Sequence, residues 1–185
     1  MEGPTKLPKR PFERGEAESM FRMARKSRDK AMLVFFWRGG LRINEARHVQ
    51  IEDCEFYRDR SMRVHITHGK GGKTRFIGFG TEWAKHVKKH IGSRKTGYVL
   101  ATKTGGMVCP TYLRRVVRHL GKAAAVKGSA HPHRFRHTCA RDLHDEQFSV
   151  LEIQTMLGHQ RLDTTQIYLQ DKGIIAGVAD RMMTR

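Results

Sequence analysis

Two alternating segments around a glycine-rich turn constrain the fold of this chain most strongly. In residues 62–67 and 74–79 apolar side chains alternate with polar ones, and residues 68–73, His-Gly-Lys-Gly-Gly-Lys, lie between them. This pattern predicts an antiparallel hairpin with one buried face. Most of the remaining apolar residues recur at helical spacing. The sequence therefore predicts a mainly helical α+β domain with a small antiparallel sheet.

The predicted helices share an apolar stripe or a recognisable first or last residue. Pro110 suits a first helical turn, and Leu113, Val116, Val117 and Leu120 follow it on one face. Asn44 is expected to cap a short helix. The full set comprises 16–37 (broken near 27–29), a helix from Asn44, 81–91, 110–126, 132–146, 149–157 and a short helix around 168, with a short strand at 98–100.

Length and composition favour a single domain over residues 1–185. The first dozen residues hold three of the five prolines, so residues 1–14 are expected to form an extended arm. No apolar run is long enough to span a bilayer, and no signal peptide is recognisable. Three widely spaced cysteines indicate reduced thiols, so we expect a cytoplasmic protein without a membrane partner.

The charge of the chain is concentrated in its middle. The net charge is +18, and residues 61–145 hold 18 Lys and Arg against three Asp and Glu. One basic surface of this kind fits a polyanion, with binding driven by counterion release. A merely solvated face is the alternative. An anionic membrane fits less well, because no single amphipathic helix carries the basic residues.

Two basic residues lie in glycine-rich contexts before the last third of the chain. Arg42 follows Gly39-Gly40-Leu41 at the start of a predicted helix, where a guanidinium can bind phosphate with two hydrogen bonds. Lys70 lies at the tip of the predicted hairpin, with Gly69 and Gly71 beside it. Each has an ordinary alternative as an exposed basic residue, and no P-loop pattern is present.

His133 and Arg136 are three residues apart, so they share one helical face, while His137 is expected to point elsewhere. A zinc site is an alternative, because His131, His133, His137 and His144 are close in sequence. However, the HExxH pattern needs a glutamate where this chain has Arg134, and the cationic neighbours oppose a divalent ion. We therefore expect no metal and no cofactor.

His159 follows Leu157-Gly158, and Tyr168 lies between Ile167 and Leu169. Taken singly, the histidine is compatible with a helix cap and the tyrosine with a half-buried packing residue. Taken together with Arg42, Lys70 and the His133–Arg136 pair, they suit phosphodiester chemistry. A phenol is the nucleophile, and cationic and imidazole donors surround the phosphate.

The order and spacing of these residues resemble the tyrosine recombinase (integrase) family. Residues 40–45, Gly-Leu-Arg-Ile-Asn-Glu, are similar to its GLRxSE motif, and residues 69–75 to its GKGxKxR hairpin. Residues 133–138 resemble HxxRHT, and residues 157–168 resemble LGHxxxxTTxxY. The resemblance implies the catalytic-domain fold of that family and spans at least Arg42 to Tyr168.

The resemblance also implies a role for each matching residue. Tyr168 would attack the scissile phosphate and form a 3′-phosphotyrosyl link, with His133 as general base or orienting group. Lys70 would protonate the leaving 5′-oxygen. The phosphate oxygens would be held by Arg42, Arg136 and His159, and Glu45 would support Arg42.

The partner implied by the family is double-stranded DNA, with self-association into a tetrameric synapse. Candidate DNA contacts are Lys73, Arg75, Arg114, Arg115, Arg118 and Arg134. Residues 172–185 are expected to form a tail that packs on a neighbouring protomer. Family members usually carry a separate N-terminal DNA-binding domain, which we expect to be absent here. Two alternatives remain: a type IB topoisomerase-like nicking and closing activity, and a non-catalytic DNA-binding module.

Overall fold

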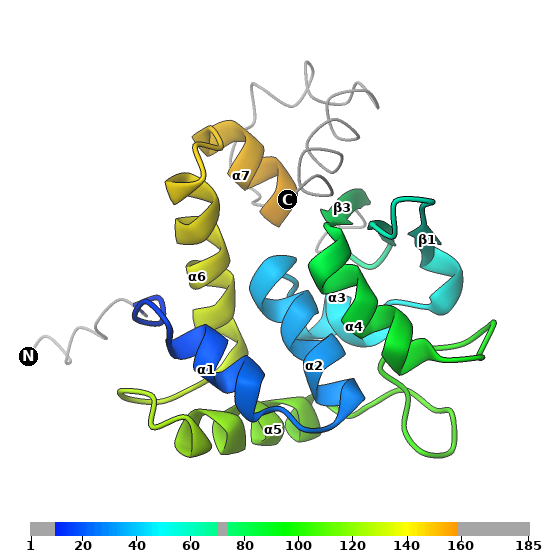
Figure 1. The fold of residues 1–185 in the computed structure, drawn as a ribbon, viewed down its shortest axis with the longest axis horizontal. Helices are drawn as coiled ribbons and strands as arrows, with labels where there is room; N and C mark the ends of the chain where they lie inside the picture. Colours follow the sequence, from blue (N-terminus) through cyan, green and yellow to red (C-terminus); the bar gives the residue numbers. More distant parts are fainter. Residues whose placement is uncertain (1–9, 70–73, 159–185) are drawn as a thin grey trace, which may run out of the picture.

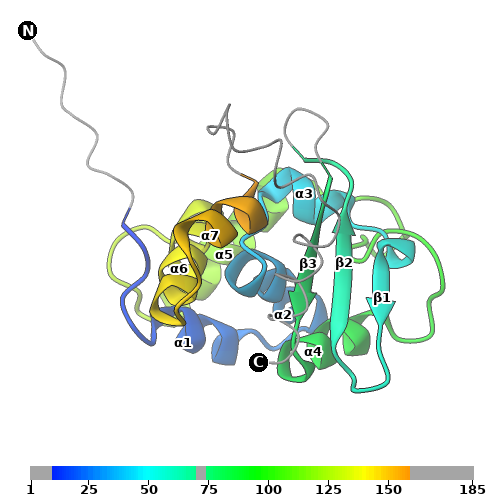
Figure 2. The same ribbon diagram turned by 90° about the horizontal axis from the view of Figure 1, so that it is seen from above.

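The computed structural model describes residues 10–69 and 74–158, which form a helical body with a small sheet at one side (Figures 1 and 2). The elements up to the sheet are α1 (Glu16–Met23), α2 (Ser27–Leu33), the π-helix η1 (Val34–Arg38), α3 (Ile43–His48) and the 3₁₀-helix η2 (Ile51–Asp53). The sheet contains β1 (Cys54–Phe56), β2 (Met62–Ile66) and β3 (Arg75–Phe79). It is followed by α4 (Thr81–Ile91), α5 (Pro110–Ala123), α6 (Pro132–Asp145) and α7 (Val150–Leu157).

The predicted hairpin is present as β2 and β3, which pair antiparallel with Val64 opposite Ile77. Alternate residues of β2 are buried, as the period-two pattern requires, and in β3 only Phe76 is partly exposed. A third strand, β1, pairs with the outer edge of β2 and places Cys54 opposite Val64. Strand β1 was not predicted, because three residues are too few to display an alternating pattern.

The core lies between the sheet and the helices, and η1 runs through its centre. All of its residues up to Trp37 are buried, and Phe35 and Phe36 are fully enclosed. The Gly39 N–H donates to the Val34 carbonyl at 3.1 Å, a bond five residues back that marks a π turn. This wider turn ends the predicted 16–37 helix, whose earlier break lies at residues 24–26, before α2 begins at Ser27.

Two local predictions were wrong. The short helix begins at Ile43 with Arg42 as its N-cap, because the carboxylate of Glu45, at the third helical position, accepts the Arg42 backbone N–H at 2.8 Å. Asn44 is therefore inside the helix. Residues 98–100 do not form a strand: Tyr98 makes one isolated bridge to Gln50.

The described part of the expected arm, residues 10–14, is fixed to the domain. Phe12 is fully buried, and its ring centroid lies 4.6 Å from that of Phe135 on α6. Its backbone N–H donates to the Thr138 hydroxyl at 2.9 Å. None of the helices in residues 10–69 and 74–158 is long and apolar enough to cross a membrane. The expected tail, 172–185, lies outside the described residues.

Candidate active site

A cleft of about 700 Å³ opens between α3, the end of β2, α5 and the start of α6. Its lining includes five of the predicted site residues: Arg42, Glu45, Arg114, His133 and Arg136. His68 and Gly69, which precede Lys70, also line it. The sequence predicted Arg42, His133 and Arg136 as parts of one site, and the fold brings them to one cavity across 94 residues of chain. Such convergence of basic side chains in a concave site is what an anionic ligand requires.

Arg136 is held from behind by backbone carbonyls. It is only 5% exposed, and its Nη1 donates to the Gly40 carbonyl at 2.6 Å while Nη2 donates to that of Leu157. Burial, and then the charge of nearby Arg42, lower its pKa to about 10, so it stays cationic at neutral pH. The guanidinium is therefore charged, oriented and desolvated before any ligand binds.

Arg42 is more accessible, with 27% of its side chain exposed. Its Nη1 donates to Glu45 Oε1 at 2.9 Å, and its Nη2 donates to the Gly158 carbonyl at 3.1 Å. Gly158 directly precedes His159 and ends α7 in the left-handed conformation, with φ of 66°. Arg42 and Arg136 thus both bind the last carbonyls of α7.

Glu45 is the buried anion that organises this group. Its exposure is 2%, and its two carboxylate oxygens accept from Arg75 at 3.1 and 2.9 Å as well as from Arg42. Burial alone would raise the pKa of Glu45, but the Arg75 hydrogen bonds and the charges of Arg75 and Arg42 lower it below the ordinary value. The ion pair between Arg42 and Glu45 is consistent with the expectation that Glu45 supports Arg42.

Arg75 has a role that the sequence did not suggest. We expected a DNA contact, but the side chain is 6% exposed and points inward, so this expectation is corrected. Its Nε donates to the Met156 carbonyl at 2.6 Å while its two terminal nitrogens bind Glu45. One guanidinium therefore ties β3 to both α3 and α7.

Arg134 is corrected in the same way. It is 9% exposed, and its guanidinium donates to the Lys127 carbonyl at 2.9 Å and the Ser129 carbonyl at 3.1 Å. It also stacks over the Phe12 ring at 4.2 Å. Arg134 thus holds residues 10–12 and the loop before α6 together. Its hydrogen-bond donors face the protein interior and not the solvent.

The other predicted DNA contacts on α5 differ from one another. Arg114 is exposed and lines the cleft. Arg115 lies over the Tyr112 ring at 5.5 Å and does not line the cleft. Arg118, also exposed, follows Arg114 by four residues and therefore lies on the same side of the helix.

His133 is exposed at the mouth of the cleft, in the first turn of α6. The ring of His137 lies beside it, with centroids 6.2 Å apart. His137 is not among the residues that line the cleft, which agrees with the expectation that it points elsewhere. On the opposite wall His68 stacks on His48 of α3 at 4.6 Å. Within residues 10–69 and 74–158, no group of three or more His, Cys, Asp or Glu is arranged to hold a metal ion.

Four predicted site residues, Lys70, Lys73, His159 and Tyr168, lie outside the described residues. Their chain neighbours are described. Gly69 lines the cleft, and the Gly158 carbonyl accepts a hydrogen bond from Arg42.

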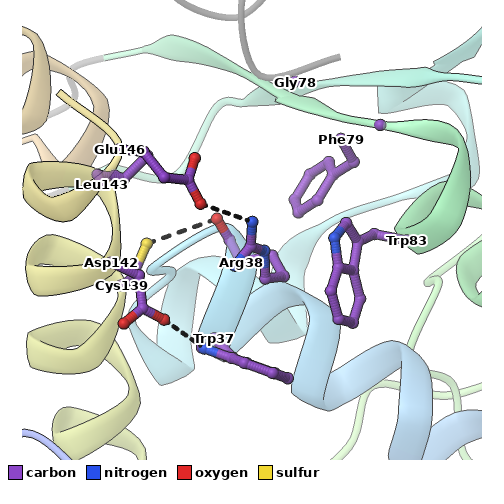
Figure 3. Close-up of a pocket in the computed structure, with 10 residues that line it drawn as sticks. Trp37, Arg38, Gly78, Phe79, Trp83, Cys139, Asp142, Leu143 and Glu146 are labelled. Carbon is purple, nitrogen blue, oxygen red and sulfur yellow. Dashed lines mark hydrogen bonds and ion pairs between the residues drawn. The ribbon is translucent and has the colours of Figure 1, made fainter. Parts of the chain in front are cut away.

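A second, much smaller pocket shows how α6 is anchored to the core (Figure 3). There Trp37 Nε1 donates to Asp142 Oδ2 at 2.9 Å, and Arg38 pairs with Glu146 at 3.4 Å. The Arg38 guanidinium also lies over the Trp83 ring at 5.0 Å. These contacts fix the second half of α6 against η1, and thereby fix the position of Arg136 in the same helix.

Comparison with known structures defines the class of fold. The chain superimposes on XerA recombinase with a TM-score of 0.75 and 22% identity, covering 100% of this chain and 67% of that one. It superimposes on the integrase of mycobacterium phage Brujita with a TM-score of 0.74 and 21% identity, covering 96% and 59%. The predicted catalytic-domain fold of tyrosine recombinases is confirmed.

Sequence comparison assigns the family. Residues 12–173 match the sequence model of the phage integrase family, and the chain belongs to that family. Tyrosine recombinase XerC of Bacillus subtilis is 30% identical over 151 residues, which cover 76% of this chain and 48% of the relative. A tyrosine recombinase of Pseudothermotoga lettingae is 31% identical over 145 residues, 77% and 49%. The chain thus spans about half the length of these relatives.

Proposed function

We propose that this chain is the catalytic domain of a site-specific DNA recombinase that cleaves and rejoins DNA through a covalent link to Tyr168. The observation that carries the proposal is the pair Arg42 and Arg136, fixed in one cleft with His133 at its mouth. The named activities of the relatives support the same class of reaction, because they include XerC recombinases and XerH bound to its difH DNA substrate.

The two arginines would bind the non-bridging oxygens of the scissile phosphate. Arg136 is suited to this because its orientation is set by the Gly40 and Leu157 carbonyls before DNA binds. Preorganised donors stabilise the developing negative charge without reorganising during the reaction. Arg114, which lines the same cleft, supplies a further positive charge for the DNA backbone.

In the chemical step, the Tyr168 oxygen attacks phosphorus and its proton passes to His133. The bond from phosphorus to the 5′-oxygen breaks, and Lys70 protonates that oxygen. His159 donates one more hydrogen bond to the phosphate. A 3′-phosphotyrosyl link and a free 5′-hydroxyl result, and attack by the 5′-hydroxyl of another strand reseals the DNA. The bond energy is conserved in the phosphotyrosine, so the cycle needs no metal or nucleotide.

Strand exchange requires more than one protomer, and we propose assembly into a tetramer on DNA. A structure of lambda integrase is a tetramer bound to a Holliday junction, which supports this arrangement. Its fold is shared with this chain at a TM-score of 0.65.

The test is a suicide substrate, a duplex nicked beside the cleavage site so that the cleaved strand diffuses away. The wild-type protein should form a covalent protein–DNA adduct, and Tyr168→Phe should form none. The proposal fails if the wild-type protein forms no adduct or if Tyr168→Phe still forms one. A 5′-thio leaving group should restore cleavage to a Lys70→Ala variant, since such a group leaves without a proton.

The alternative nicking and closing activity is distinguished by supercoiled plasmid. If relaxation occurs with no joined products when two recombination sites are present, the chain acts as a type IB topoisomerase-like enzyme. Joined products whose formation depends on paired sites support recombination.

A further inference from the structure

A basic pocket lies where the α1–α2 junction meets α4. It has a volume of about 360 Å³ and is lined by Arg25, Ser27, Lys30, Lys85, His86 and Lys89. Figure 2 places α4 and the α1–α2 junction on one side of the domain and α3, which lines the candidate catalytic cleft, on the other. The pocket shares no lining residue with that cleft.

The positive charge of this pocket is largely unneutralised. Lys85 pairs with Glu82, but Arg25, Lys30 and Lys89 make no ion pair with any carboxylate in the described part of the chain. The positive electrostatic potential of the pocket affects His86, whose pKa is lowered first by burial and then by the charges of Lys30 and Lys85. Three unpaired cations around one concavity repel one another, and an anion would relieve that repulsion.

Two of the lining groups are held in position. The Lys30 ammonium lies 5.1 Å from the centre of the Phe21 ring, a cation–π contact that limits its motion. The Ser27 hydroxyl lies 3.2 Å from His90 Nδ1, which fixes it at the base of α2. Lysine, arginine and hydroxyl groups together form the usual set of ligands for phosphate.

We propose that this pocket binds the phosphate backbone of a second DNA duplex, so that one protomer holds two DNA segments. This inference rests on the proposed function, which supplies DNA as the ligand of the catalytic cleft. A duplex is stiff, with a persistence length of about 150 base pairs, so a short segment in the cleft cannot also reach the opposite side. The second site must therefore engage a different segment.

DNA fits this surface better than a lipid bilayer does. Membrane association of a helical surface needs several exposed apolar side chains beside the basic ones. Among the described residues near the pocket, Met23 is the single large apolar side chain with substantial exposure, at 49%. Counterion release from a polyanion, by contrast, needs only the unpaired cations.

The experiment measures capture of a second duplex. An unlabelled duplex carrying the recombination site is immobilised, the protein is bound to it, and a labelled duplex of unrelated sequence is added. The test variant is Arg25→Gln with Lys89→Gln. The matched control is Arg58→Gln with Lys103→Gln, two exposed cations that line neither cavity. Formation of the covalent adduct on the suicide substrate is measured in parallel.

We expect the test variant to capture the labelled duplex more weakly and to retain wild-type adduct formation, while the control keeps both. The slope of log K against log salt for the second duplex should fall in magnitude by about 2, one for each phosphate contact removed. Equal capture by the two variants would overturn the proposal. So would capture by wild-type protein of vesicles containing phosphatidylserine but not of DNA.

The outcomes separate this proposal from the proposed function. If the wild-type protein forms no adduct but captures the second duplex through Arg25 and Lys89, the recombinase proposal fails and the pocket proposal stands. If the adduct forms and no variant alters capture, the reverse holds.

Discussion

Arg75 on β3 and Glu45 on α3 form a bidentate ion pair in the interior of the domain, with nitrogen–oxygen distances of 2.9 and 3.1 Å. The side chains are 6% and 1% exposed. Because Glu45 also binds Arg42, the ion pair connects the buried framework to a guanidinium at the cleft surface. The geometry of the proposed phosphate-binding arginines therefore depends on Arg75, which does not line the cleft.

Replacing Arg75 with methionine should destabilise the domain by about 3 to 5 kcal/mol, because it leaves a buried carboxylate without its main partner. Urea denaturation followed by circular dichroism measures this loss. The matched double variant, Arg75→Met with Glu45→Met, should be less destabilised than the sum of the single variants, since it removes the stranded charge. Strict additivity would contradict the importance assigned to this pair.

The stability of the domain should depend on pH through Glu45. The pKa of Glu45 is lower in the folded than in the unfolded protein, so its contribution is complete above the unfolded value, about 4.3. That contribution is lost as pH falls below this value and through the folded pKa. The difference in stability between the wild-type protein and Glu45→Gln should thus be constant near neutrality and shrink in acid. A difference that grows below pH 4 would contradict the assignment.

His133 and His137 are adjacent imidazoles with different expected roles. His133 lines the cleft, so His133→Ala should slow adduct formation by about 100-fold or more, as loss of a general base or orienting group does. His137 is not among the lining residues, so His137→Ala is the matched control and should retain most of the activity. Single-turnover cleavage of the suicide substrate measures both. Equal losses would mean that the two rings act as a unit.

Gly40 is expected to tolerate no side chain. Its φ is 58°, and a Cβ there would lie 2.3 Å from Leu157 Cδ2. Gly40→Ala should therefore cost about 1–2 kcal/mol of backbone strain and about 1–3 kcal/mol more for the steric overlap. Gly105→Ala is the control, since its φ is also positive, at 85°, but nothing lies within 4 Å. Thermal unfolding should show the larger loss at Gly40, and Leu157→Ala should relieve part of it.

Local patterns predicted the elements of this fold well where they were long. The hairpin followed from the alternation in 62–67 and 74–79, and α5 from helical spacing and an initial proline. The three-residue strand β1 and the single bridge at Tyr98 carry too few residues for any period to appear. The end of the first helical region depends on a π turn, which no residue type specifies.

Sequence motifs predicted a list of site residues, but they did not predict the direction in which each arginine side chain points. Arg75 and Arg134 both lie in family motifs, and the guanidinium of each binds groups in the protein interior. Their partners lie 30 and 81 residues away for Arg75, and up to 124 residues away for Arg134. Such pairings are set by how the helices pack, which a short motif does not encode. Arg42 and Arg136 line one cleft, as the family resemblance implies, and their roles toward a phosphate stay predictions.

The last carbonyls of α7 accept hydrogen bonds from Arg42 and Arg136, at Gly158 and Leu157. These are the same two guanidinium groups that would bind the scissile phosphate. The position of α7 and the binding of phosphate would therefore be thermodynamically coupled. A shift of α7 that alters these hydrogen bonds would change the affinity for phosphate, and bound phosphate would change the preferred position of α7 by the same free energy. Binding of DNA by these two arginines would thereby change the position of the end of α7.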